Sequence, residues 1–143
     1  PYNILQREYE GETRDLCHKA GISYMAYSPT AQGLLAGRLS DKARNFPARQ
    51  WNKLYQEPLL TRSKLLREKV NNIAMDIKTK PIAVAVAWVL EQKNVITAIV
   101  GSRKAHQVSE FALAGSLKLS TEQLNQLDKA SNLFYEKQIF NGK

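Results

Sequence analysis

The chain has 143 residues, which suits one domain, and 43% of them are hydrophobic, so it can bury a core. Its single cysteine excludes an intrachain disulfide and fits a reducing cytosol, and no apolar run is long enough to cross a membrane. The formal net charge is +8, and between positions 38 and 69 nine basic residues face three acidic ones. Such a field attracts phosphorylated ligands or other polyanions, although a solvated surface is the simplest interpretation. Nucleic acid is the least favoured partner, because no nucleic-acid-binding motif accompanies the charge.

The N-terminal part contains a helix followed by a strand. Residue 1 is proline and no secretory leader is visible, so we expect a cytoplasmic protein whose translation starts upstream of this residue. Positions 2–5 could be a strand end, and 13–20 form a helix with Leu16, Cys17 and Ala20 on one face. We expect Cys17 to be a helix-packing residue rather than a reactive thiol. The short, mostly apolar run 22–27 predicts a buried parallel strand, ended by Ser28 and Pro29.

Residues 30–60 are predicted to form a long irregular loop, because glycines and prolines interrupt the segment throughout. A loop of this length inside a compact domain is usually functional. Beyond it, the spacing of apolar residues predicts a helix over 63–77. Pro81 opens a second helix, to about position 92, which is apolar on every side and must therefore be buried.

The C-terminal part repeats the same alternation. Positions 95–100 predict a second buried strand, Gly101 and Ser102 turn the chain, and 105–115 form a helix. Ser120 and Gln123 make a capping box for a last helix with apolar positions to 133, while 134–143 is a tail without a pattern. Alternating helices and strands predict an α/β fold with a parallel sheet. Because two full strands leave both edges and one face open, we expect self-association or pairing with a missing part of the sheet.

Both predicted strands end in sequence that suits a phosphate. Parallel strands end at the same edge of a sheet, where α/β proteins bind their ligands. Ser102 offers a hydroxyl, Arg103 a forked cation, and the next helix free N–H groups. Either strand end alone could be an ordinary helix cap, but two of them separated by a basic loop favour a phosphate site. Tyr27, the last residue of the first strand, could stack on a flat ring or be a core tyrosine.

Four runs in the chain resemble consecutive segments of aldo-keto reductases. In order, 1–8 resembles the segment around the sixth strand, 21–37 the seventh strand with its cofactor loop, and 81–90 the helix before the last strand. The run 99–110 resembles the eighth strand and the adenosine-phosphate helix. The resemblance implies that residues 1–143 are a single partial domain, the C-terminal part of a (β/α)8 TIM barrel with the last two to three strands. It also implies NADP as the cofactor, with 30–60 as the loop that covers it.

The resemblance assigns a cofactor role to thirteen residues. Tyr27 matches the aromatic that stacks on the nicotinamide, and Arg38 stands where a phosphate-binding Lys or Arg is common. Phe111 replaces the asparagine that usually bonds the adenine, so it could only pack against that ring. Ribose and pyrophosphate are contacted by the loop residues Ser28, Thr30, Gln32, Gly33 and Leu34. The 2′-phosphate is held by the turn after the second strand, which contains Gly101, Ser102 and Arg103. The adenosine is reached by two residues of the next helix, Gln107 and Glu110.

The family's catalytic tetrad of Asp, Tyr, Lys and His has no match in this chain, because it comes from the first part of the barrel. None of the six tyrosines matches the catalytic one, and His18 and His106 are expected to face solvent or cap helices. The implied function is the cofactor-binding part of an NADP-dependent reductase that converts aldehydes or ketones to alcohols. The alternatives are a non-catalytic NADP-binding or oligomeric module and a basic polyanion-binding domain.

Overall fold

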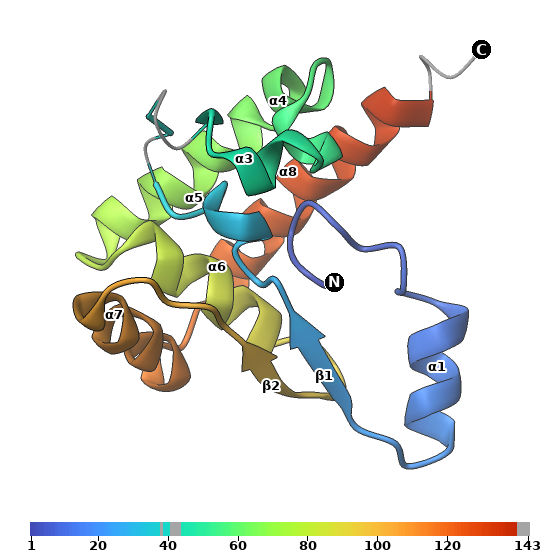
Figure 1. Ribbon diagram of the computed structural model, residues 1–143. Helices are drawn as coiled ribbons and strands as arrows, with labels where there is room; N and C mark the ends of the chain where they lie inside the picture. Colours follow the sequence, from blue (N-terminus) through green and yellow to red (C-terminus); the bar gives the residue numbers. More distant parts are fainter. Residues whose placement is uncertain (38, 41–43, 140–143) are drawn as a thin grey trace.

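Two short parallel strands form the sheet of the computed structural model, which describes residues 1–37, 39–40 and 44–139. Strand β1 (Tyr24–Tyr27) pairs with β2 (Val95–Ile99), with Ala26 opposite Ala98 (Figure 1). The predicted strand end at 2–5 is not a strand. Instead, the Tyr2 amide donates a single hydrogen bond of 3.0 Å to the Tyr27 carbonyl, which holds the N-terminal segment beside the end of β1.

Helix α6 (Pro81–Leu90) forms the centre of the core. It packs against β2 and between α5 (Lys64–Asp76) and α7 (Ala105–Ser116), and all of its residues from position 82 to 89 are buried. The prediction of a helix buried on every side is therefore confirmed. Trp88 is buried near the C-terminal end of this helix. Its ring stacks on that of Tyr2, with the ring centres 5.7 Å apart, and its indole N–H donates to the Asp128 carboxylate at 3.0 Å.

The last helix is longer than its sequence pattern predicts. Helix α8 (Thr121–Ile139) packs on α5 and includes most of the stretch predicted as an unpatterned tail, which makes that prediction wrong up to position 139. Phe134 is buried, and the Tyr135 hydroxyl contacts the backbone of Leu5 and Arg7. These anchors lie at the other end of the chain, so local periodicity could not reveal them. The predicted capping box is confirmed by hydrogen bonds of 2.8 and 3.2 Å between residues 120 and 123.

Helix α1 (Glu12–Lys19) forms as predicted but stands apart from the main body (Figure 1). It buries none of its residues, and Leu16 is 68% exposed, while Cys17 is half-buried. The face that Leu16, Cys17 and Ala20 share is therefore mostly uncovered among the described residues, because Leu16 and Ala20 are exposed and only Cys17, expected to pack, is partly buried. Arg14 attaches the helix to the body by donating to the Lys93 carbonyl at 2.6 Å.

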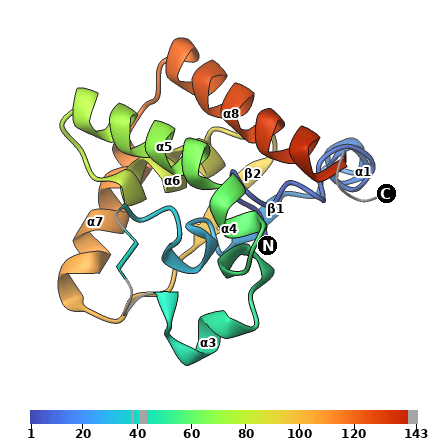
Figure 2. The ribbon, with the colours of Figure 1, turned by 90° about the horizontal axis from the view of Figure 1, so that it is seen from above.

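Only one face of the sheet is covered. Helices α5, α6 and α8 lie together on one side of the strands, as the view from above shows (Figure 2). Ala26 points to that side and is fully buried, whereas on the other face Met25 is 61% and Ile99 is 52% exposed. The prediction of fully buried strands is therefore wrong, because no second layer covers this face among the described residues.

The described part of the connection between β1 and α5 contains several short helical turns, which the prediction of an irregular loop did not include. It contains η1 (Ala31–Gly33), α3 (Pro47–Gln50), η2 (Lys53–Tyr55) and α4 (Leu59–Arg62). Leu54, Tyr55 and Leu60 anchor it to the core, a tertiary effect that a count of glycines and prolines does not capture. Among the residues that the structure describes, no helix combines the length and apolarity needed to span a membrane.

Candidate functional site

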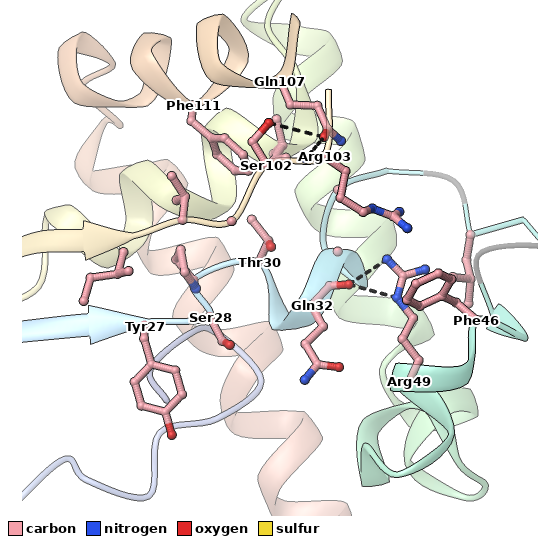
Figure 3. Close-up of a pocket in the computed structure, with 18 residues that line it drawn as sticks. Tyr27, Ser28, Thr30, Gln32, Phe46, Arg49, Ser102, Arg103, Gln107 and Phe111 are labelled. Carbon is pink, nitrogen blue, oxygen red and sulfur yellow. Dashed lines mark hydrogen bonds between the residues drawn. The ribbon is translucent and has the colours of Figure 1, made fainter. Parts of the chain in front are cut away.

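A pocket of about 690 Å³ lies at the carboxyl ends of β1 and β2, between the turn after β1, the segment after β2, and α3 (Figure 3). This is the edge of a parallel sheet at which ligands bind. Ten of the thirteen predicted residues line it: Tyr27, Ser28, Thr30, Gln32, Gly33, Gly101, Ser102, Arg103, Gln107 and Phe111. The structure therefore brings both predicted strand ends into one site.

The turn after β1 holds an unusual backbone conformation. Ser28, Ala31 and Gln32 all have φ between 50° and 55°, a region that non-glycine residues rarely adopt. Each such residue costs about 1–3 kcal/mol unless its surroundings enforce it, and such strain clusters at functional sites. In this turn the surroundings hold the backbone in place. Ala31 is fully buried, and the side-chain amide of buried Asn3 donates to the Ser28 carbonyl at 3.0 Å.

Gly33 allows α3 to clamp this turn. The Arg49 guanidinium donates to the Gln32 carbonyl at 2.8 and 3.1 Å. A Cβ at Gly33, whose φ is +90°, would lie 2.8 Å from the Arg49 Nη2 atom. The absence of a side chain at this position therefore permits both the backbone conformation and the close approach of the arginine.

Two arginines meet at the Phe46 ring on the rim of the pocket. The Arg103 guanidinium carbon lies 4.9 Å from the ring centre and that of Arg49 lies 6.0 Å away, so a strand end and α3 converge on one aromatic side chain (Figure 3). Arg49 also stacks over Tyr55 at 5.2 Å, and the Tyr55 hydroxyl donates to the Gln32 carbonyl at 3.1 Å. Burial raises the pKa of Tyr55, opposed by nearby arginines. The rim favours an anionic, flat ligand.

Phe46 and Arg49 line the pocket although no sequence pattern predicts them as site residues. Both belong to the segment interpreted as an irregular loop. In that segment the sequence does not distinguish Arg49 from the other basic residues among the nine between positions 38 and 69. The proline at position 47, a frequent first residue of helices, was the one local sign that α3 would form there. Nothing local shows that this short helix folds back onto the pocket.

Several polar groups in and after the turn that follows β2 form hydrogen bonds with one another. Gln107 accepts the backbone N–H groups of Arg103 and Lys104 at 2.9 and 3.1 Å, and so caps α7. Its side-chain oxygen is therefore engaged in the turn rather than offered to an adenosine. Ser102 donates to the Lys104 carbonyl at 2.8 Å, and no atom lies within 4 Å of a Cβ built on Gly101. What remains open to a ligand is the Gly101 backbone and the Arg103 side chain.

Two aromatic residues flank the pocket in different ways. Tyr27 is 53% exposed among the residues that the structure describes, with its ring at the mouth of the pocket and its flat face accessible (Figure 3). Phe111 is half-buried against the small cluster of Ala83, Val86 and Ala114 and lines the same pocket. Its position suits packing against a ring and offers no hydrogen bond.

Three predicted residues fall outside the pocket lining. The Leu34 side chain is fully buried in the core, and Glu110 is half-buried on α7 without lining the pocket. Arg38 lies outside the described residues. The roles of these three remain predictions. His18 and His106 are exposed, as expected. Among the described residues that line the pocket, Arg49 and Arg103 can attract an anion and Tyr27 can stack on a ring.

Two parallel strands joined through helices, with a cationic pocket at their carboxyl ends, are typical of the ligand-binding part of an α/β protein. The model of the Aldo/keto reductase family matches residues 1–132, and the chain belongs to this family. An uncharacterized oxidoreductase of Mycobacterium tuberculosis is 34% identical over 110 residues, which are 77% of this chain and 34% of that protein. The probable aldo-keto reductase 1 of Glycine max is 27% identical over 132 residues, covering 90% of this chain and 38% of that protein.

Solved structures agree with this assignment. The chain resembles the glycerol dehydrogenase AKR11B4 from Gluconobacter oxydans with a TM-score of 0.79 and 27% identity, covering 91% of this chain and 40% of that one. A thermostable aldo-keto reductase, Tm1743, shares the fold with a TM-score of 0.63 at 23% identity. The fold is therefore part of a (β/α)8 barrel, as predicted. The chain spans between 34% and 40% of the length of these relatives.

Proposed function

We propose that the strand-end pocket binds NADP, and that the chain is the cofactor-binding part of an NADP-dependent oxidoreductase that reduces aldehydes or ketones to alcohols. The observation that carries the proposal is the convergence of residues from both strand ends on one pocket with two arginines at its rim. The pocket residues fit the cofactor, because an accessible Tyr27 ring suits the nicotinamide and an open Gly101 backbone with Arg103 suits a phosphate. The pocket lies in a chain whose lone cysteine favours a cytoplasmic location.

In this proposal the residues of the chain bind and orient the cofactor. The Tyr27 ring stacks on the nicotinamide, while Arg103 and Arg49 hold negative charge at the opposite, Phe46 side of the pocket. When bound, NADPH supplies the hydride that is transferred to the carbonyl carbon of the substrate. The described lining includes no carboxylate, lysine or histidine, and its one tyrosine, Tyr27, is the ring that we propose stacks on the nicotinamide. We therefore place the source of the matching proton outside this chain. We place the catalytic tetrad in the part of the barrel that this chain does not span.

Titration of the chain with NADPH, followed by cofactor fluorescence, tests the proposal. Arg103→Ala removes a cation from the rim and should weaken binding at least about tenfold, the range of a charge-assisted hydrogen bond. Lys19→Ala is the matched control, because Lys19 is exposed on α1 and does not line the pocket. If Arg103 contacts the 2′-phosphate, the variant should also lose preference for NADPH over NADH. Equal NADPH binding by Arg103→Ala and Lys19→Ala would refute the role of Arg103.

A second candidate function is a non-catalytic NADP-binding module, which is consistent with a described lining that contains no carboxylate, lysine or histidine. The two candidates differ in turnover. Mixing the chain with an N-terminal segment of a related barrel that carries the tetrad should restore carbonyl reduction if the chain is a reductase part. A complex that binds NADPH without consuming it would favour the non-catalytic module.

We further propose that the exposed sheet face is covered by the remaining strand–helix units of the barrel. Met25 and Ile99 on this face are each more than half exposed, and the chain spans only 34% to 40% of its relatives. Light scattering of the isolated chain should give a mass well above the 16.2 kDa monomer, because the uncovered face self-associates. Adding the complementary segment should replace these assemblies by a defined complex. A stable monomer at micromolar concentration that ignores the complement would refute this.

A further inference from the structure

The N-terminal segment, residues 1–6, lies beside the carboxyl end of β1 and forms hydrogen bonds with two successive carbonyls there (Figure 1). The Tyr2 amide donates to the Tyr27 carbonyl at 3.0 Å, and the side-chain amide of Asn3 donates to the Ser28 carbonyl at 3.0 Å. Asn3 is fully buried and is not one of the residues that line the pocket. Any effect of Asn3 on a ligand in the pocket therefore passes through the backbone that it holds.

Ser28 has a backbone conformation that its own sequence does not favour. Its φ is 53°, in the left-handed region, although a residue before a proline prefers an extended conformation. The Ser28 carbonyl accepts the Asn3 side chain and also the Ala31 N–H, the latter at 2.9 Å, so both of its lone pairs have a partner. Asn3 thus fixes the direction of the carbonyl with which the pocket turn begins.

The Asn3 side chain is itself held in one orientation. Its Oδ1 accepts the Leu5 N–H at 2.9 Å, and its Nδ2 donates to the Gln6 Oε1 atom at 3.0 Å as well as to Ser28. The backbones of Asn3 and Gln6 also pair in both directions, at 2.9 and 3.1 Å. A buried side-chain amide whose oxygen and two N–H groups all have partners is a rigid support.

The other end of the turn is held differently. Arg49 and Tyr55 both donate to the Gln32 carbonyl, but Arg49 also lines the pocket. A substitution at Arg49 would therefore change contacts with a ligand as well as the turn. Replacing Asn3 changes the support of the turn without removing a side chain from the pocket lining.

We propose that Asn3 is a positioning residue of the strand-end pocket, which keeps Ser28 and the turn after it in the arrangement that binds the cofactor. The inference rests on the proposed NADP function. Without the Asn3 amide, the Ser28 carbonyl keeps only the Ala31 N–H, and the turn can relax toward the extended conformation preferred before a proline. NADP then binds only the fraction of molecules in which the turn is formed, which lowers its apparent affinity.

Titration of the full chain with NADPH, followed by cofactor fluorescence, tests the proposal with three variants. Asn3→Ala should bind NADPH about three- to tenfold more weakly, the range of one hydrogen bond. Asn3→Asp keeps the acceptor for the Leu5 N–H but has no N–H for the Ser28 carbonyl, so it should weaken binding at least as much. Ser131→Ala is the matched control and should bind as the parent does. The buried Ser131 hydroxyl donates to the Ile4 carbonyl at 2.7 Å, so it supports the same segment without contacting the turn.

Hydrogen exchange of the Ala31 amide separates this inference from the proposed function. Because that N–H donates to the Ser28 carbonyl, its protection should fall about tenfold in Asn3→Ala and stay unchanged in Ser131→Ala. If thermal melts show that Asn3→Ala does not fold, Asn3→Asp, which keeps the side-chain volume, provides both readouts. A parent that does not bind NADPH would rule out the proposed function even if Ala31 protection falls as expected.

Three results would overturn the positioning role of Asn3. The first is an equal loss of NADPH affinity in Asn3→Ala and Ser131→Ala, which would indicate a general effect on stability. The second is an Asn3→Asp variant that binds NADPH as the parent does. The third is an Ala31 amide that is as protected in the Asn3 variants as in the parent.

Discussion

Replacing Gly33 by alanine separates the backbone strain of the pocket turn from the contact with Arg49. An alanine at φ +90° carries a steric cost of about 1–2 kcal/mol. Its Cβ would lie 2.8 Å from the Arg49 Nη2 atom. Because that atom ends a flexible side chain, it can move, but the move weakens its hydrogen bond to the Gln32 carbonyl, worth about 0.5–1.5 kcal/mol. Alanine also lowers the entropy of the unfolded chain, which returns about 0.4–1 kcal/mol.

The expected net loss for Gly33→Ala is therefore about 0.5–3 kcal/mol, or about 2–10 °C in melting temperature for a chain of this size. Urea denaturation followed by circular dichroism measures it. Gly115→Ala is the matched control, because Gly115 is exposed in α7, has no positive φ and leaves 4 Å of open space for a Cβ. That control should lose no stability, since alanine favours a helix.

A double-mutant cycle then isolates the Arg49 contribution. In the parent, Arg49→Ala removes the clamp on the Gln32 carbonyl; in the Gly33→Ala background much of that clamp is already lost, so the same substitution should cost less. NADPH affinity should fall in both single variants. Equal stability of Gly33→Ala and Gly115→Ala would refute the strain argument, and strictly additive effects of Gly33→Ala and Arg49→Ala would refute the proposed contact.

Two further predictions concern the core next to the site. Trp88→Ala should lower the free energy of unfolding by about 3–5 kcal/mol, because it empties the buried position stacked on Tyr2; a loss below about 1 kcal/mol in urea denaturation would contradict the packing. Burial alone would raise the pKa of Glu10, but hydrogen bonds from Arg7 and Tyr2 and the positive charges of nearby arginines lower it on balance. The resulting stabilisation is present above the unfolded pKa of about 4.3 and is lost as pH falls through the lower folded pKa. The denaturation midpoint of the parent should therefore fall more steeply than that of Glu10→Gln between about pH 5 and 3, and parallel curves would rule out this linkage.

The sequence alone determined the parts of this protein whose signals are local. A run of ten residues from Pro81 without a charge cannot face water, so α6 had to be the central buried helix. The Ser120–Gln123 cap depends on residues three positions apart, and the alternation of strands and helices sets the parallel topology. The order of family-like segments was sufficient to predict the barrel fragment and most of the pocket residues.

The tertiary structure decided what depends on contacts between distant positions. The C-terminal part of α8 is anchored by the Tyr135 hydroxyl, which donates to the Leu5 carbonyl. Tyr27 is exposed because no second layer covers its face of the sheet among the described residues. Phe46 and Arg49 join the pocket only because short helical turns anchored in the core fold the connection back onto the strand ends. Local sequence patterns indicate secondary-structure propensity and burial. The contact of Arg49 and Arg103 with the Phe46 ring instead depends on segments more than fifty positions apart lying side by side in the folded chain.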